Sequence, residues 1–179
     1  MVGTRDDPDA PPMAVAPEGT LLLVGDLGYD GEFGLGGSEY LLRFDGEDRF
    51  PALPEDPKAL VETLATVVDE PHVRATHDVS HGGLAVSLAE MVSEDAGIDA
   101  TLSVEDVEGA LFHEQPGRAL IQTTDPDAVR EAFDGIAPVH EIGVGTDEGL
   151  LSLSFDDDTL ELGGEEIADL RSTIDRGMD

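Results

Sequence analysis

The chain has 179 residues, enough for one domain with a hydrophobic core and few for two. Its 41 acidic residues face 9 basic ones, which gives a formal net charge of -32 at pH 7. This balance leaves no basic patch for nucleic acid, while the apolar fraction of 40% is too high for a disordered acidic polymer. There is no cysteine for disulfide or thiolate chemistry, and no apolar stretch approaches the ~18 residues of a membrane span. Because the N-terminus also lacks a signal sequence, we expect a cytoplasmic protein that binds neither nucleic acid nor membrane.

The acidic residues are spread along the chain rather than gathered in a tail, and Lys58 is the only lysine. A surface this negative repels itself in dilute buffer, whereas salt at 1 M shortens the Debye length to about 3 Å. We interpret the composition as an adaptation to a cytoplasm of molar salt. An acidic mimic of nucleic acid or a calcium-loading protein is the alternative.

The first part of the chain divides into a lead-in, a strand and a glycine-rich loop. Residues 1–19 are rich in proline and are expected to form an extended lead-in or a linker from an upstream domain. Residues 20–25 (TLLLVG) predict a short buried strand. The glycine-rich loop 26–37 then leads to Ser38, which we expect to cap a short helix ending at Arg43.

The rest of the chain alternates between helices and strands without internal repeats. Further helices are expected at 55–70, 82–94, 126–133 (capped by Asp125) and 165–174, and further strands at 72–79, 98–104, 117–123, 138–144, 150–155 and 159–162. The first of these helices places Leu60, Val61, Leu64, Val67 and Val68 on one stripe, and the second places Leu84, Leu88 and Met91 on its inner face. This order predicts an α/β (α+β) sandwich over residues 20–175, with helices packed on at least one face of a mixed sheet.

Two glycine-rich runs carry the clearest functional signal. Residues 34–41 read GLGGSEYL and residues 77–91 read HDVSHGGLAVSLAEM. In each, a polar turn opens directly into a helix, so that backbone N–H groups and the positive end of a helix dipole point at one spot, which suits a phosphate. The residues expected to bind the phosphate of a substrate or nucleotide are Gly36, Gly37, Ser38, His77, Asp78, Ser80, Gly82 and Gly83.

Structural roles compete with this interpretation. Ser38 is equally expected as a plain helix N-cap. For Asp78 we expect a carboxylate that accepts N–H bonds across the turn, and for His77 a contact with substrate or with the core. Gly82 is expected to take an unusual φ, and Gly83 to allow close packing of the helix on a strand.

Three further features of the sequence could be ligand sites. His77, Asp78 and His81 offer metal ligands, but they span a strand end and a turn and lack a third partner, so we expect no metal here. The run 156–158 (DDD) is expected to be a solvated hairpin turn rather than a calcium site. Arg118 could offset a ligand phosphate, although a structural ion pair is expected.

In their order and spacing, the two runs resemble the last domain of phosphoribosylformylglycinamidine (FGAM) synthase, large synthetase subunit, within the AIR synthase-related C-terminal domain family. Residues 1–3 resemble the strand that leaves the preceding domain of the family, residues 117–121 a later strand of this domain, and residues 142–151 its closing hairpin. The resemblance therefore extends from Gly3 to about Leu170. His81 departs from the family pattern, which usually has Asp or Glu at this place.

The resemblance implies an ATP-dependent step of purine biosynthesis, in which formylglycinamide ribonucleotide (FGAR) becomes its amidine with ammonia from glutamine. It implies ATP and Mg²⁺ as cofactors of the whole enzyme. The implied partners are an ATP-binding-type N-terminal domain of the same synthetase, a glutaminase subunit and a small purine-pathway subunit. The family's catalytic histidines and most of its ATP and magnesium ligands lie in the N-terminal domains. We therefore assign no catalytic or metal-binding residue to this chain and expect it to be inactive alone.

Other functions remain open at this point. The chain could be the C-terminal domain of another AIR synthase-superfamily enzyme, namely aminoimidazole ribonucleotide synthase, selenophosphate synthetase or a hydrogenase maturation factor, although the run GGSEY is not expected there. It could also be a non-catalytic interaction remnant of a split synthetase. A His-Asp metallohydrolase is disfavoured, because no further ligand set accompanies His77 and Asp78.

The charge predicts a dependence of folding on salt. Dialysis from molar KCl to below a few tenths molar should abolish the circular-dichroism signal of the folded chain, because the carboxylates then repel one another over longer distances. A signal fully retained at low salt would contradict the adaptation to molar salt.

Overall fold

The sheet is built around strand β1 (Thr20–Val24), the buried strand expected at 20–25. The side chains of Leu21, Leu22, Leu23 and Val24 are all 0% exposed in the computed structural model, which describes residues 11–27, 34–155 and 158–176. Because consecutive side chains of a strand point to opposite faces, a strand buried throughout needs a cover on both faces.

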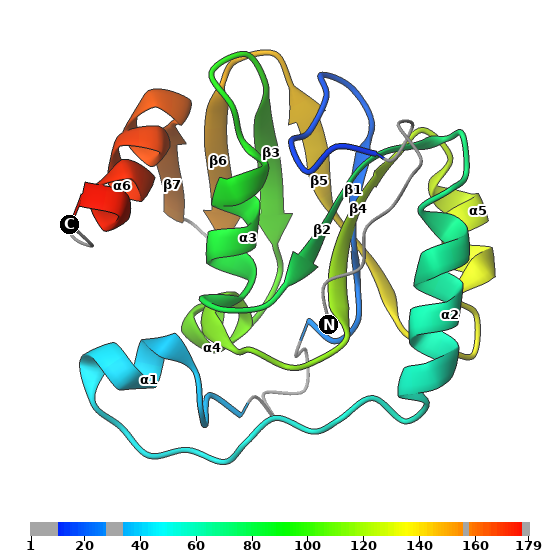
Figure 1. The fold of residues 1–179 in the computed structure, drawn as a ribbon, viewed down its shortest axis with the longest axis horizontal. Helices are drawn as coiled ribbons and strands as arrows, with labels where there is room; N and C mark the ends of the chain where they lie inside the picture. Colours follow the sequence, from blue (N-terminus) through cyan, green and yellow to red (C-terminus); the bar gives the residue numbers. More distant parts are fainter. Residues whose placement is uncertain (1–10, 28–33, 156–157, 177–179) are drawn as a thin grey trace.

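Within the described residues, seven strands form one mixed sheet in the order β2-β4-β1-β5-β3-β6-β7 (Figure 1). The other strands are β2 (Val73–Val79), β3 (Gly97–Leu102), β4 (Arg118–Thr123), β5 (Val139–Thr146), β6 (Leu150–Phe155) and β7 (Asp158–Gly163). Only β3 and β6 pair in parallel; the other neighbours are antiparallel. The predicted mixed sheet is therefore confirmed.

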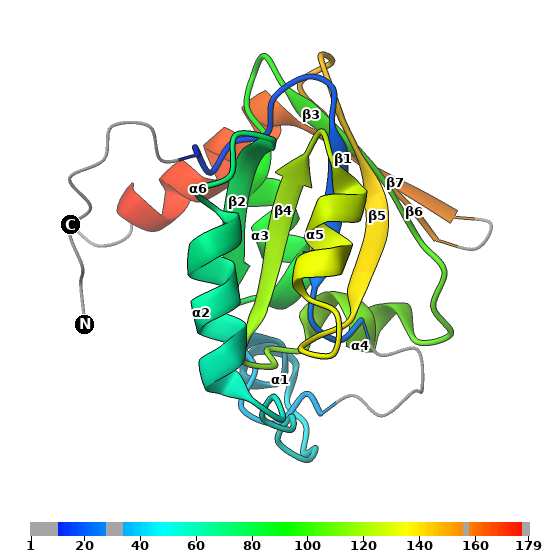
Figure 2. The same ribbon diagram turned by 90° about the vertical axis from the view of Figure 1, so that its right-hand side faces the viewer.

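Helices cover both faces of this sheet. The helices are α1 (Glu39–Phe44), α2 (Pro57–Val67), α3 (Gly83–Met91), α4 (Val107–Phe112), α5 (Pro126–Ala132) and α6 (Gly164–Arg176). Helices α2 and α5 lie together on one face (Figure 2) and pack there with the β1 side chains Leu22 and Val24. Helices α3, α4 and α6 contribute to the larger core on the other face, together with Leu21 and Leu23. Helix α1 lies beyond the end of the sheet (Figure 1).

The sequence patterns gave most of these elements, with two errors. On α2, Leu60 and Val67 are buried as expected, but Val61 is 62% exposed and does not belong to the core stripe. Helix α4 was not predicted at all. Two features of the sequence mark this helix. Asp106 is its N-cap, with an Oδ1 that accepts the Gly109 N–H at 2.9 Å, and the buried residues Gly109, Ala110 and Leu111 follow.

The described part of the lead-in packs on the domain. The side-chain amide of Gln122, 0% exposed on β4, accepts the Ala16 N–H at 2.8 Å and donates to the Ala16 and Glu18 carbonyls. The Val15 N–H donates to the Met91 carbonyl at the end of α3. Residues 11–19 are thus tied to both the sheet and a helix. Residues 1–10, residues 28–33 of the glycine-rich loop, Asp156 and Asp157, and residues 177–179 lie outside the described residues.

Candidate functional site: a junction of two glycine-rich turns

The first glycine-rich turn is held against the segment that follows α1. The Gly36 N–H donates to the Arg49 carbonyl at 2.8 Å, and a Cβ at Gly36 would lie 2.6 Å from that carbonyl oxygen. Gly37 has φ +82, a conformation that L side chains rarely adopt. Ser38 is buried, and its Oγ accepts the Leu41 N–H at 3.3 Å, so it is the N-cap of α1.

The second turn leads into α3 through two glycines with left-handed backbone. Gly82, the N-cap of α3, has φ +82 as expected, and Gly83 has φ +66. A Cβ at Gly83 would lie 2.5 Å from the Leu111 carbonyl oxygen at the end of α4. The close packing expected at Gly83 is therefore against a helix and not against a strand, because α4 itself was missed. The Ser80 carbonyl accepts the Gly83 N–H at 2.9 Å and closes the turn.

One carboxylate joins the two turns. The Oε1 atom of half-buried Glu114 accepts the N–H of Glu39, the first residue of α1, at 2.9 Å. The same atom accepts the N–H of Gly82 at 2.8 Å. Acids are favoured at helix N-termini because they satisfy free N–H groups and the helix dipole. We call the meeting of Glu39, Gly82 and Glu114 the junction. Glu114 was not among the expected site residues.

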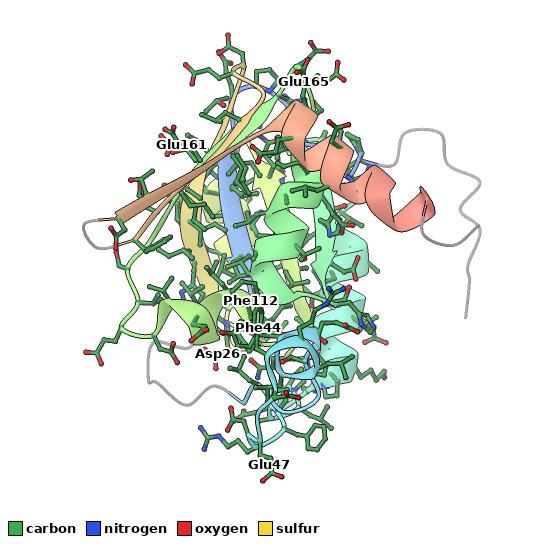
Figure 3. The ribbon with its side chains drawn as sticks, turned by 90° about the vertical axis from the view of Figure 1, so that its left-hand side faces the viewer. Asp26, Phe44, Glu47, Phe112, Glu161 and Glu165 are labelled. Atoms are coloured by element: carbon green, nitrogen blue, oxygen red, sulfur yellow. The ribbon has the colours of Figure 1, made fainter. Side chains whose placement is uncertain are left out.

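Side chains reinforce the junction. The Nδ1 of His81 lies 3.6 Å from the Oε1 of Glu39, so the residue that departs from the family pattern contacts the other glycine-rich run. The ring of Tyr40 stacks on that of Phe112 with centroids 4.9 Å apart and lies 4.8 Å from Phe44. Figure 3 shows Phe44 and Phe112 near one another where α1 meets the body of the domain. Both glycine-rich runs lead into helices, α1 and α3, as predicted. The fold brings the N-termini of these two helices together at Glu114.

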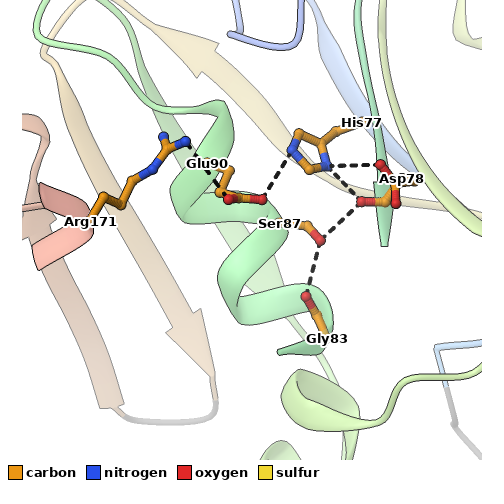
Figure 4. Close-up of polar contacts among 6 residues, drawn as sticks. All are labelled: His77, Asp78, Gly83, Ser87, Glu90 and Arg171. Carbon is orange, nitrogen blue, oxygen red and sulfur yellow. Dashed lines mark hydrogen bonds and ion pairs between the residues drawn. The ribbon is translucent and has the colours of Figure 1, made fainter. Parts of the chain in front are cut away.

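His77 and Asp78 lie on β2 and belong to a different network (Figure 4). The Nδ1 of buried His77 donates to the Asp78 carbonyl at 2.6 Å, and its Nε2 lies 3.3 Å from a carboxylate oxygen of Glu90 on α3. Arg171 of α6 lies 3.8 Å from the other oxygen of Glu90. The Ser87 hydroxyl also contacts the Asp78 carbonyl, at 3.1 Å. This network fastens α3 and α6 to the sheet.

The role expected for Asp78 is wrong. Its carboxylate is 78% exposed and accepts no N–H bond from the turn. Glu114 takes the N–H of Gly82 in its place. Asp78 contributes through its backbone carbonyl, because its side chain points away from the sheet face that α3 covers.

A buried arginine lies beside the junction. Arg118 is 3% exposed, and its Nη1 donates to the His113 carbonyl at 2.9 Å. Its Nε and Nη2 are buried and have no hydrogen-bond partner. Burial lowers the pKa of the guanidinium to about 10, and the charge of Asp26 opposes that shift. The expected structural ion pair is not formed with any described carboxylate. Ser80, His81, Glu114 and Arg118 line a common cavity of about 440 Å³.

The neighbouring His113 is 2% exposed. Its burial, and after it the positive charge of Arg118, lowers the pKa of the imidazole to about 3. The ring is therefore neutral near pH 7, and its protonation in the folded state is costly.

The described residues contain no group of three or more His, Asp or Glu side chains that could hold a metal ion. Among the same residues, no helix is both long and apolar enough to cross a membrane.

Residues 16–156 match the family described as AIR synthase related protein, C-terminal domain, and the chain belongs to this family. It is 52% identical over 180 residues to the phosphoribosylformylglycinamidine synthase subunit PurL of Haloarcula marismortui. This alignment covers 98% of the chain and 25% of the relative. The family resemblance read from the two glycine-rich runs is confirmed. The chain spans about a quarter of the length of the curated relative.

Solved structures of PurL share the fold. T. maritima PurL complexed with FGAR superposes with a TM-score of 0.66 at 18% identity, over 89% of this chain and 29% of that one. T. maritima PurL complexed with ATP gives a TM-score of 0.65 at 17% identity, over 92% of this chain and 28% of that one.

The contact between Gly83 and α4 can be tested by comparing two glycines of positive φ. Gly83→Ala should lower the free energy of unfolding by about 1 kcal/mol for the backbone strain and by a further 1–3 kcal/mol or so for the clash with Leu111. Gly135→Ala, at φ +69 with nothing within 4 Å of its Cβ, should cost only the first term. Urea unfolding in molar KCl measures both, and equal losses would contradict the close contact at Gly83.

The buried His113 predicts a loss of stability in acid. Between about pH 6.5 and pH 3 the unfolded chain binds a proton at this histidine and the folded chain does not, so the free energy of unfolding should fall by up to about 1.4 kcal/mol per pH unit as the pH is lowered. This contribution is complete above pH 6.5. His113→Gln should flatten that part of the curve of stability against pH. His81→Gln, at an exposed ring, is the control, and an equal flattening there would refute the assignment to His113.

Proposed function

We propose that this chain is the C-terminal domain of a phosphoribosylformylglycinamidine synthase, and that its two glycine-rich turns bind the phosphate of a ligand. Membership of the family and the 52% identity to a PurL subunit support the assignment. The activity proposed is that of the whole synthetase, ATP-dependent amidation of FGAR, to which this domain contributes one wall of a cleft.

The observation that carries the proposal is the shared acceptor at the junction. Two N–H groups that lie far apart in sequence, from Glu39 and Gly82, converge on one carboxylate oxygen at 2.9 and 2.8 Å. A position that satisfies two backbone donors at two helix entrances is an anion position. On this proposal the turn of Gly36, Gly37 and Ser38 and the turn of Ser80, Gly82 and Gly83 flank one such position. His77 and Asp78 support α3 behind it.

In the proposed reaction, ATP phosphorylates the amide oxygen of FGAR, ammonia displaces the phosphate, and ADP leaves. The turns of this chain would bind and orient a phosphate through backbone N–H groups, which need no proton transfer and no metal of their own. T. maritima PurL, which shares this fold, has been solved in one complex with ATP and in another with FGAR. Catalytic groups, Mg²⁺ and most of its ligands are assigned to the ATP-binding-type domain that would complete the cleft.

Further features of the proposal follow from the family and the charge. The glutamine-derived ammonia would come from a glutaminase subunit, with a small purine-pathway subunit in the assembly. The domain would comprise residues 20–175, with 1–19 as the lead-in from a preceding domain. The net charge of -32 and the haloarchaeal relative support function in a cytoplasm of molar salt.

Inorganic phosphate and ATP, added to the ¹⁵N-labelled chain in molar KCl, test the proposed anion position. The amide signals of Gly36, Gly37, Glu39, Gly82 and Gly83 should shift together along one binding curve, because the two turns form one site. The turn at Gly149, which also has positive φ, is the internal control and should not respond.

Signals that shift at one turn only would contradict a joint site. No response at either turn, to either ligand, would favour a non-catalytic remnant that keeps the fold without the ligand.

A further inference from the structure

We propose that a groove beside helix α1 is the surface on which this domain docks the ATP-binding-type domain of the proposed synthetase. This rests on the proposed function, because that function supplies the second domain. The groove has a volume of about 650 Å³ and is lined by the first glycine-rich turn, by α1 and by the segment that follows α1. Its large apolar side chains are Leu41, Leu42 and Phe50, which we call the apolar face.

The apolar face is exposed and does not serve the core of this domain. Leu42 is 75% and Phe50 is 78% exposed, and Phe44 and Leu53 in the same stretch of chain are 70% and 73% exposed. None of these four belongs to the two hydrophobic cores that the described residues form. A single exposed apolar residue is ordinary, but several large ones in one short segment indicate a surface that contacts another protein.

The groove is held in place without the help of the apolar face. None of the six described residues of α1 is buried, and the helix is fixed at the junction. The segment after α1 is held by the Gly36 N–H, which donates to the Arg49 carbonyl at 2.8 Å. The side-chain amide of Gln115 also donates to the Ala52 carbonyl, at 3.2 Å. The groove is therefore formed in advance, and a partner need not order it on binding.

The groove adjoins the first glycine-rich turn. Gly36 and Gly37 form part of its lining. A Cβ at Gly37 would lie 2.7 Å from the Cε1 of Phe50, so the phenyl ring lies against the turn itself. Helix α1 and the segment after it lie beyond the end of the sheet, at the edge of the domain (Figure 1). A domain docked on the apolar face would therefore cover this turn and close the proposed cleft there.

Length and charge identify the occupant. The alignment covers 25% of the H. marismortui relative, so a synthetase of that length has room for further domains beside this one. The net charge of this chain is -32, and at 1 M salt the attraction between charges extends only about 3 Å. Contact between apolar surfaces does not depend on charge. The partner domain is therefore expected to present an apolar surface, with the exposed Glu47 and Asp48 at the polar rim of the contact.

The test places the chain in a protein of full length. The aligned quarter of the H. marismortui PurL subunit is replaced by this chain, and hydrogen exchange of residues 34–53 is measured by mass spectrometry in molar KCl. The same residues are followed in the isolated chain. Exchange should be at least about tenfold slower in the longer protein, because the docked domain protects the groove.

Two substitutions remove the apolar face. Leu42→Gln and Phe50→Gln together should restore the fast exchange in the longer protein. In the isolated chain they should change it by less than about twofold, because both side chains are exposed there. Val61→Gln, at a side chain that is 62% exposed on α2, is the matched control and should change the exchange in neither protein. Circular dichroism shows whether each variant is folded.

Three results would overturn the docking site. The first is exchange of residues 34–53 that is as fast in the longer protein as in the isolated chain. The second is slow exchange that Leu42→Gln with Phe50→Gln leaves unchanged, because the covering domain would then not use the apolar face. The third is slow exchange in the isolated chain that depends on concentration and accompanies the mass of two chains, which would make a second copy the occupant.

Amidation of FGAR by the longer protein separates the docking site from the proposed function. A protein that protects the groove but does not amidate FGAR would contradict the proposed function alone. A protein that amidates FGAR while residues 34–53 exchange fast would contradict the docking site alone.

Discussion

The architecture depends on a strand that has no exposed face. The side chains of β1 are inaccessible on both sides of the sheet, so each side requires its own layer of helices, and the two cores on either side follow from this requirement. β1 also ends abruptly at Gly25, where φ is +102 and a Cβ would lie 2.8 Å from the Cγ of Arg118. Because Gly25 has no side chain, the chain can pass close to the buried Arg118 at this end of the sheet.

The proposed phosphate position at the junction would have to act within a strongly acidic chain. Repulsion by a net charge of -32 works against any external phosphate, and only local donors can offset it. Backbone N–H groups at helix N-termini are well suited to binding an anion in such a chain, because the fold fixes their positions and they carry no net charge. Glu114 satisfies two of these donors, the N–H groups of Glu39 and Gly82, and so holds the two turns together.

Prediction from the sequence worked where the signal is local. The run of apolar residues in β1, the stripe on α3 and the caps Ser38 and Asp125 each depend on neighbours within a few positions, and all were found. Helix α4 was missed because it has only six residues and a glycine among them. Glu114 could not be found at all, because its partners lie 75 and 32 residues away in the sequence. The role of Asp78 was wrong for the same reason, since the acceptor for the turn comes from another part of the chain.

The edge strand β7 shows what molar salt demands of a sheet. β7 pairs with β6 on one side only, and Leu160, in its middle, is 43% exposed. Its acidic neighbours Asp158 and Glu161 would repel a second chain in dilute buffer, but at 1 M salt this repulsion extends only about 3 Å. At that ionic strength a pairing strand would still have to desolvate these carboxylates, and the chain turns directly from β7 into α6 at Gly163. Charged side chains on an edge strand disfavour its pairing with a second molecule, a role that is separate from support of the fold.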